Sequence, residues 1–91
     1  MDELRKNEKL KTNIFISAIN GRYEVQFLYN LNPILFHPYY ISKNKLGKKV
    51  LYGRISNSSA IEKFEFKYIA NIKVLKNKKF SPIIPIMSMV S

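Results

Sequence analysis

The chain opens with apolar residues at helical spacing. Between residues 2 and 20, the residues Leu10, Ile14 and Ala18 recur four positions apart, which places them on one face of an α-helix. Gly21 follows at the position where a glycine commonly ends a helix. The pattern therefore predicts an N-terminal helix, and we expect its polar part before residue 10 to fray.

After the helix, apolar and polar residues alternate, which is typical of half-buried strands. Leu28 interrupts this alternation in the first strand. Pro38 makes the centre of the second strand an edge or a bulge, and Gly53 marks a bulge or a close-packing point in the third. We expect a mainly β (α+β) fold in which the helix covers a bent antiparallel sheet or small barrel. The predicted strands are residues 23–30, 34–42, 50–56, 62–68 and 72–76.

Length and composition fit one folded domain. Ninety-one residues suffice for one modest core, and a hydrophobic content of 46% argues against disorder. We expect residues 1–9 to be a frayed extension, residues 10–80 the core domain, and residues 81–91 a C-terminal tail. The absence of cysteine excludes disulfides and thiolate metal sites. The N-terminus lacks the apolar segment of a signal peptide, so we expect a soluble, cytoplasmic protein.

Positive charge is concentrated in two segments. The formal net charge is +10, and residues 43–54 and 73–79 contain five and four basic residues respectively, with no acid. Such a field favours an anionic partner, although a lysine-rich solubilising surface would have the same composition. The basic residues are Lys43, Lys45, Lys48, Lys49 and Arg54 in the first segment, and Lys73, Lys76, Lys78 and Lys79 in the second.

Several strings resemble, in their order and spacing, the WYL domains of bacterial regulatory proteins. The matching strings are ISAI at 16–19, VQFLY at 25–29, LFHPYYI at 35–41, GKKVLYG at 47–53, FEFKYIANI at 64–72 and KF at 79–80. The resemblance covers about residues 10–80. It implies an SH3-like or Sm-like bent sheet that binds ligands or nucleic acid and that serves transcription regulation. WYL domains usually follow a helix-turn-helix domain, so this chain would be a stand-alone module or part of a larger system.

The signature positions of the family are only partly retained. Lys49 and Val50 replace the signature Trp and Tyr, and Leu51 alone survives. Lys67 and Tyr68 replace the family's Asp-Arg pair, and Glu62 replaces an Arg. The fold therefore carries over better than the ligand-contacting residues do.

The residue types argue against most enzyme classes. His37 is the single histidine and Asp2 the single aspartate, so no Ser-His-Asp triad and no His-rich metal site can be assembled within the chain. We expect neither catalysis nor a cofactor. One enzymatic alternative stays open: a metal-independent ribonuclease, in which His37, Arg54 and Tyr52 would converge and supply general acid–base help.

Nucleic-acid binding suits the interleaving of aromatic and basic residues. Single-strand binders combine a basic groove with aromatic platforms, and the chain has six Tyr and six Phe. Most Phe should belong to the core, whereas Tyr39, Tyr40, Tyr52 and Tyr68 are candidate platforms. We predict that a basic hairpin binds single-stranded nucleic acid or a small anionic ligand. The predicted contact residues are Lys43, Lys45, Lys48, Lys49, Tyr52, Arg54, Lys76, Lys78 and Lys79.

A third alternative is a protein-interaction module. An edge strand, together with the apolar residues 83–90, could join a partner protein or a second copy of the chain.

Overall fold

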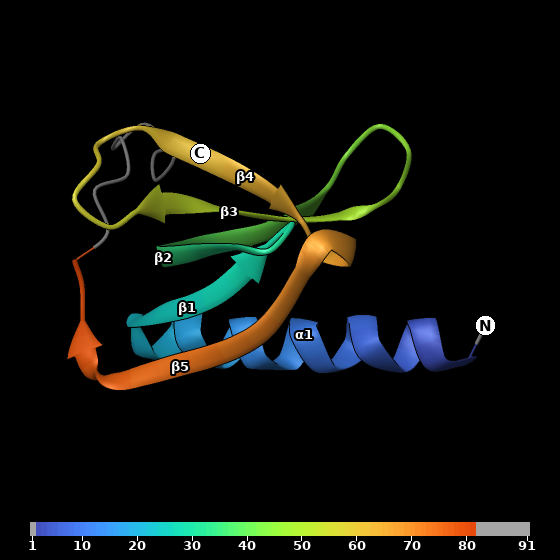
Figure 1. Ribbon diagram of the computed structural model, residues 1–91, viewed down its shortest axis with the longest axis horizontal. Coiled ribbons are helices and arrows are strands. Elements are labelled where there is room, and N and C mark those ends of the chain that lie inside the picture. The colour runs from blue at the N-terminus through green and yellow to red at the C-terminus, as the bar shows by residue number, and fades with distance from the viewer. Residues whose placement is uncertain (1, 82–91) are drawn as a thin grey trace.

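The fold is one helix followed by five antiparallel strands, as the sequence predicts (Figure 1). This computed structural model describes residues 2–81, with side chains from residue 6 onward. The elements are α1 (Asp2–Gly21), β1 (Tyr23–Tyr29), β2 (Asn32–Lys43), β3 (Lys49–Ile55), β4 (Ile61–Glu65), a 3₁₀ turn η1 (Phe66–Tyr68) and β5 (Ile69–Lys79). Residues 83–90, proposed above as an apolar docking segment, lie outside the described residues.

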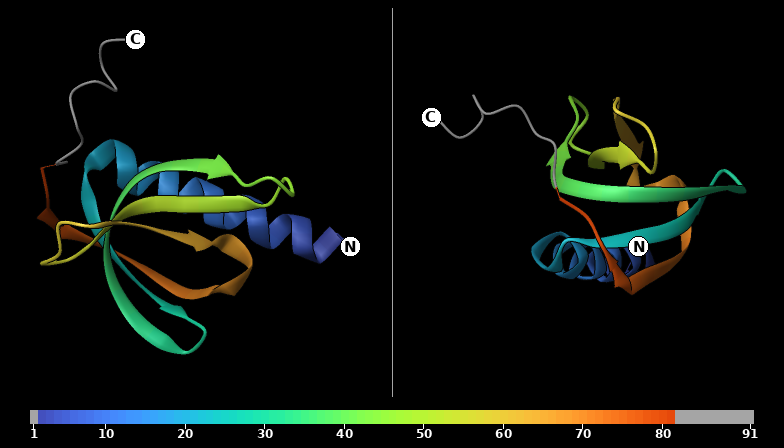
Figure 2. Two further views of the ribbon diagram at one scale, coloured as in Figure 1. Left: turned by 90° about the horizontal axis from the view of Figure 1, so that it is seen from above. Right: turned by 90° about the vertical axis from the view of Figure 1, so that its left-hand side faces the viewer.

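The five strands form a single bent sheet in the order β4-β3-β2-β1-β5. Its two outer strands, β4 and β5, are consecutive in the chain and are joined by η1 alone. In a flat sheet these strands would lie about 19 Å apart, whereas the four peptide units from Glu65 to Ile69 span about 14 Å at most. The sheet must therefore curl, and Figure 2 shows this strong curvature.

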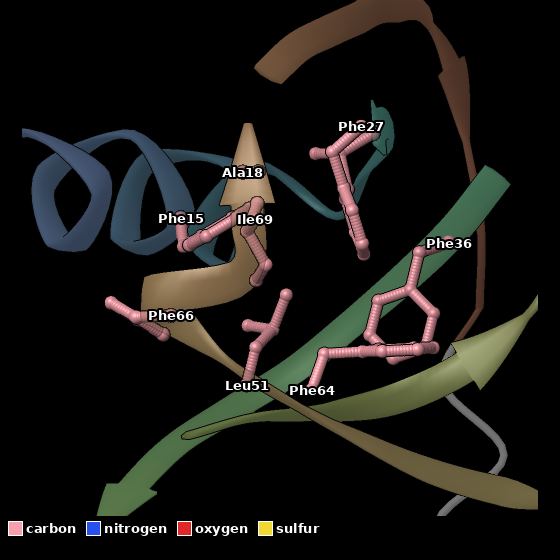
Figure 3. Packing of buried hydrophobic residues seen from close by; sticks show 9 residues of the cluster. Phe15, Ala18, Phe27, Phe36, Leu51, Phe64, Phe66 and Ile69 are labelled. Atoms are coloured by element: carbon pink, nitrogen blue, oxygen red, sulfur yellow. The ribbon is translucent and has the colours of Figure 1, made fainter. Parts of the chain in front are cut away.

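Phenylalanines dominate the core between α1 and the inner face of the sheet (Figure 3). Their rings meet edge to face, with centroids 5.1 Å apart for Phe36 and Phe64 and 5.4 Å for Phe15 and Phe66. Each such pair contributes about 0.5–1.5 kcal/mol beyond the burial of its area. The buried cluster consists of Phe15, Ala18, Val25, Phe27, Phe36, Leu51, Phe64, Phe66 and Ile69. The side chains that alternate with these along each strand point to the opposite face of the sheet, which is called the outer face below.

One predicted detail of the strands is confirmed and another is corrected by the structure. Of the edge or bulge expected at Pro38, the structure has the bulge, because β2 is the central strand. A register shift between Pro38 and Tyr40 forms the predicted bulge, and this irregularity accommodates a residue that cannot donate to the ladder. The predicted strand 62–68 ends at Glu65, because η1 carries the chain from one edge of the curled sheet to the other.

Gly53 confirms the expected close-packing point. A Cβ built at this position would collide first with the backbone carbonyl oxygen of His37, and it would lie 2.7 Å from Cε2 of Phe36. Glycine is therefore what lets β3 pack directly against the backbone of β2 and the buried ring of Phe36.

Candidate functional site

The β2–β3 hairpin holds its lysines on an ordered turn. The side chain of Asn44 accepts hydrogen bonds from the backbone N–H groups of Leu46 (2.9 Å) and Lys48 (3.0 Å). The N–H of Gly47 donates to the carbonyl of Asn44 at 2.9 Å, and Gly47 has a φ of +77°, which favours glycine. The backbone from which the lysines project is thus fixed by local contacts.

Three of the four hairpin lysines are exposed. Lys43, Lys45 and Lys48 point their ammonium groups into solvent with no hydrogen bond among the described residues. Lys49 differs, because its Nζ donates to Thr12 Oγ1 of α1 at 2.8 Å. The hairpin therefore presents a small basic surface and uses one lysine to attach itself to the helix.

Two stacked tyrosines lie on the outer face next to the hairpin. Tyr40 of β2 and Tyr52 of β3 are paired across the strands, with ring centroids 4.9 Å apart and planes inclined by 5°. Tyr40 is 49% exposed and neither ring belongs to the core cluster. The exposed Lys63 of β4 is the cross-strand partner of Tyr52. Rings that stack on each other outside the core offer a flat surface beside positive charge.

A polar network lies on the same outer face, toward the other end of β3. Glu24, His37 and Arg54 come from β1, β2 and β3. Arg54 donates through Nη2 to Nδ1 of His37 at 3.1 Å, through Nε to the hydroxyl of Tyr39 at 3.2 Å, and through Nη1 to the carbonyl of Ser58 at 2.6 Å. This guanidinium is therefore occupied by contacts within the protein.

The network determines the tautomer of His37. An arginine can only donate, so Nδ1 of His37 must accept and Nε2 must carry the proton. Nε2–H then donates to Oε1 of Glu24 at 2.8 Å. Both side chains are about 10% exposed, and the ring of Phe80 stacks on His37 at 4.4 Å with an interplanar angle of 3°. Glu24, which the sequence interpretation did not single out, is the partner that binds this histidine.

The structure brings together two of the three residues of the ribonuclease alternative. His37 and Arg54 are hydrogen-bonded, Tyr52 stacks on Tyr40, and Phe80 covers one face of the imidazole. Phe80 is held in place, because its N–H donates to the carbonyl of Arg22 at 2.9 Å. The described contacts give His37 the role of a buried cross-strand link.

The second lysine-rich segment is separated from the hairpin. Lys76, Lys78 and Lys79 belong to the end of β5, which lies at the opposite end of the molecule from the β2–β3 turn in Figure 1. Lys79 is exposed, and its Nζ lies 5.5 Å from the ring centroid of Tyr23. The predicted contact residues thus form two groups, and one short ligand cannot touch both.

Neither a metal-ligand cluster nor a membrane-spanning helix is found in the described residues. Residues 6–81, whose side chains are described, contain no group of three or more His, Cys, Asp or Glu side chains placed to hold a metal ion. Within the same residues, no helix has both the length and the apolar character needed to span a bilayer.

Among solved structures, the chain is similar to proteasome accessory factor B/C (PafBC) of Arthrobacter aurescens. The TM-score is 0.68 at 18% sequence identity, over 84% of this chain and 13% of that chain. At this identity the likeness concerns the fold, and it supports the WYL-related fold that the order of the motifs implies. No protein-family model and no curated protein matches the chain.

Proposed function

We propose that this chain is a WYL-like regulatory or accessory module that binds single-stranded nucleic acid. The binding surface consists of the stacked tyrosines Tyr40 and Tyr52 and of the exposed lysines around them. The observation that carries the proposal is the parallel pair of tyrosines outside the core cluster, because a base can stack on the ring of Tyr40, which is 49% exposed. The lysines of this surface are Lys45, Lys48 and Lys63, whereas Lys43 and its cross-strand partner Lys49 belong to the opposite face.

The spacing suits a short stretch of extended strand. Lys48 and Tyr52 are four residues apart at the start of β3 and therefore share a face, about 13 Å apart along an extended strand. A base can then stack on the tyrosines while the neighbouring phosphates reach the hairpin lysines. Base stacking on an aromatic side chain contributes about 1–3 kcal/mol per base, and it requires a base whose face is not already covered. Single strands are therefore preferred over duplexes.

Arg54 and the lysines of β5 are less well placed than the hairpin lysines to contact a nucleic acid bound at the tyrosine pair. Arg54 makes three internal hydrogen bonds, and Lys76, Lys78 and Lys79 lie at the other end of the molecule. Their contact with an anionic ligand stays a prediction.

Fluorescence anisotropy with labelled single-stranded DNA and RNA, and with a duplex of the same sequence, tests the proposal. Three phosphate contacts predict a slope of log K against log salt of about −2.1 for a single strand. Replacing Tyr40 by alanine should weaken binding by about 5- to 150-fold, the equivalent of one lost stacked base. Tyr68→Ala is the matched control, because Tyr68 is similarly exposed and also lies beside a lysine, but its ring contacts Tyr29 of β1 rather than the tyrosine pair of the hairpin.

Two double Lys→Glu variants distinguish binding at the proposed surface from general attraction between the basic protein and the nucleic acid. Lys45→Glu combined with Lys48→Glu changes the net charge as much as Lys76→Glu combined with Lys78→Glu does. The proposal requires the first pair to weaken binding far more than the second. Equal losses from both pairs, a duplex bound as tightly as the single strand, or no effect of Tyr40→Ala would refute it.

A further inference from the structure

The turn between β1 and β2 contains a leucine in an unfavourable backbone conformation. Tyr29 pairs with Asn32, so Asn30 and Leu31 form a two-residue turn, with φ values of +49° and +72°. Asparagine and glycine suit such a turn, whereas a leucine with positive φ costs about 1–2 kcal/mol. Leu31 is 86% exposed and therefore recovers none of this cost by packing within the chain.

The outer face beside this turn is unusually apolar. Leu28, the residue that interrupts the alternation of β1, pairs with Pro33 on this face. Next to them, Leu35 and Leu75 line a shallow groove of about 280 Å³. The core and α1 lie on the inner face, and Figure 2 shows the β1–β2 hairpin projecting away from the helix. An apolar sheet face is normally covered by another layer, and no described element covers this one.

The charge around the groove has one sign. Lys78 lines the groove, and Lys73 is the cross-strand partner of Gln26, which also lines it. None of the residues that line the groove is acidic. The nearest carboxylate along β1, that of Glu24, is buried and accepts the hydrogen bond from His37. A partner that fits this surface must combine apolar side chains with negative charge.

We propose that the outer face of the β1–β2 hairpin docks an amphipathic helix of a partner protein, with leucine-like side chains on one face and carboxylates on the other. Apolar residues spaced three and four apart would enter the groove, as in other helix-in-groove complexes. The carboxylates would meet Lys73 and Lys78. Leu31 would contribute a side chain that packs against the partner, which accounts for a leucine kept in a strained turn. This surface does not include the tyrosine pair, so the inference does not depend on nucleic-acid binding.

The test uses the full chain and a labelled helical peptide with leucines at helical spacing and glutamates between them. We expect saturable binding by fluorescence anisotropy, with backbone-amide NMR shifts confined to β1, β2 and β5 around the groove. Two control peptides, one with lysine in place of glutamate and one with serine in place of leucine, should not bind. A peptide that is attracted only by the net positive charge of the protein would instead shift the NMR signals of the lysine-rich β2–β3 turn, and that result overturns the proposal.

Two sets of variants examine the leucine and the charges. Leu31→Gly should raise the melting temperature, because glycine tolerates the positive φ, while weakening the peptide by about tenfold, as expected when a contact of about 1.4 kcal/mol is lost. A gain in stability together with a loss of peptide affinity would show that Leu31 serves binding rather than folding. Lys73→Glu combined with Lys78→Glu should abolish binding of the glutamate peptide and permit binding of the lysine peptide.

Three further outcomes would overturn the proposal. The first is an absence of binding to the glutamate peptide. The second is concentration-dependent self-association, measured by sedimentation and lost in Leu31→Gly, because the occupant would then be a second copy of the chain. The third is peptide binding seen only when Ile83, Ile84 and Ile86 are all replaced by serine, because residues 82–91 of the same chain would then occupy the groove.

Discussion

Replacing His37 by phenylalanine isolates the energetic role of the buried network. The substitution keeps a planar ring against Phe80 but removes both ring nitrogens. Glu24, which is 8% exposed, then has no described donor for its Oε1, and Arg54 loses one of its three hydrogen bonds. Leaving a buried acceptor without its hydrogen-bond donor costs about 1–3 kcal/mol, and more when the acceptor is charged. We therefore expect His37→Phe to be clearly destabilising.

The double variant Glu24→Leu with His37→Phe should be more stable than His37→Phe alone. It removes the orphaned carboxylate together with its partner, and well-packed apolar replacements of a buried pair are often neutral. Glu24→Gln should cost only about 1 kcal/mol, because its amide oxygen still accepts the proton of Nε2 and only the charge assistance is lost. The three variants thus separate the charge from the hydrogen bond.

Urea unfolding of the wild type and the variants measures these differences. With an m-value of about 2 kcal/mol/M for a domain of this size, a loss of about 2 kcal/mol moves the midpoint by about 1 M. Adding the single variant Glu24→Leu completes a double-mutant cycle, which gives the coupling energy between the two side chains. The reasoning fails if His37→Phe costs less than about 1 kcal/mol, or if Glu24→Leu and His37→Phe add without coupling.

Three further predictions concern packing and ionisation. Gly53→Ala should cost about 1–3 kcal/mol by chemical unfolding, because its Cβ would meet the carbonyl oxygen of His37 and the ring of Phe36. Gly47→Asn has open space and introduces a residue that tolerates positive φ, so its cost should stay within about 0.5 kcal/mol. Equal costs for the two substitutions would contradict the clash. Phe27→Ala should cost about 3–5 kcal/mol and lower the melting temperature by roughly 15 °C or more in a calorimetric scan, and a smaller effect would place Phe27 outside the core. Burial lowers the pKa of Lys11 from its ordinary value of 10.5, and the negative charge of Glu8 opposes this lowering in part. Between the lowered pKa of the folded state and 10.5, the unfolded chain binds more protons than the folded chain, so the free energy of unfolding should rise with pH in this range. An NMR titration of Lys11 with a midpoint at or above 10.5 would disprove this.

The candidate binding surface was predicted only in part, for a geometric reason. Asn44 and Gly47 marked the hairpin, and Tyr52 was placed beside its lysines from sequence neighbours alone. The stacking of Tyr52 on Tyr40 depends on the register of β2 against β3, which the bulge after Pro38 shifts. A bulge that a sequence suggests does not reveal which residues become opposite each other across the strands.

The amino-acid sequence by itself determined the order of the elements and the side of the sheet on which most side chains lie. The helical stripe and the period-two alternation are local properties, since a side chain's direction follows from the backbone conformation of its own segment. For this reason α1 and the core residues Val25 and Phe27 of β1 are found where the pattern predicts them, whereas Leu10 of the helical stripe is 58% exposed and Glu24 of the polar face of β1 is buried.

Tertiary structure decided what the strands bring together. Glu24, His37 and Arg54 meet because three neighbouring strands place them in one row, and the two lysine-rich segments are kept apart because the sheet order puts their ends at opposite ends of the molecule. The same curvature ended β4 at Glu65 and required a 3₁₀ turn. These outcomes depend on pairing between residues that are distant in the chain, and such pairing is a property of the whole packed sheet rather than of any one segment.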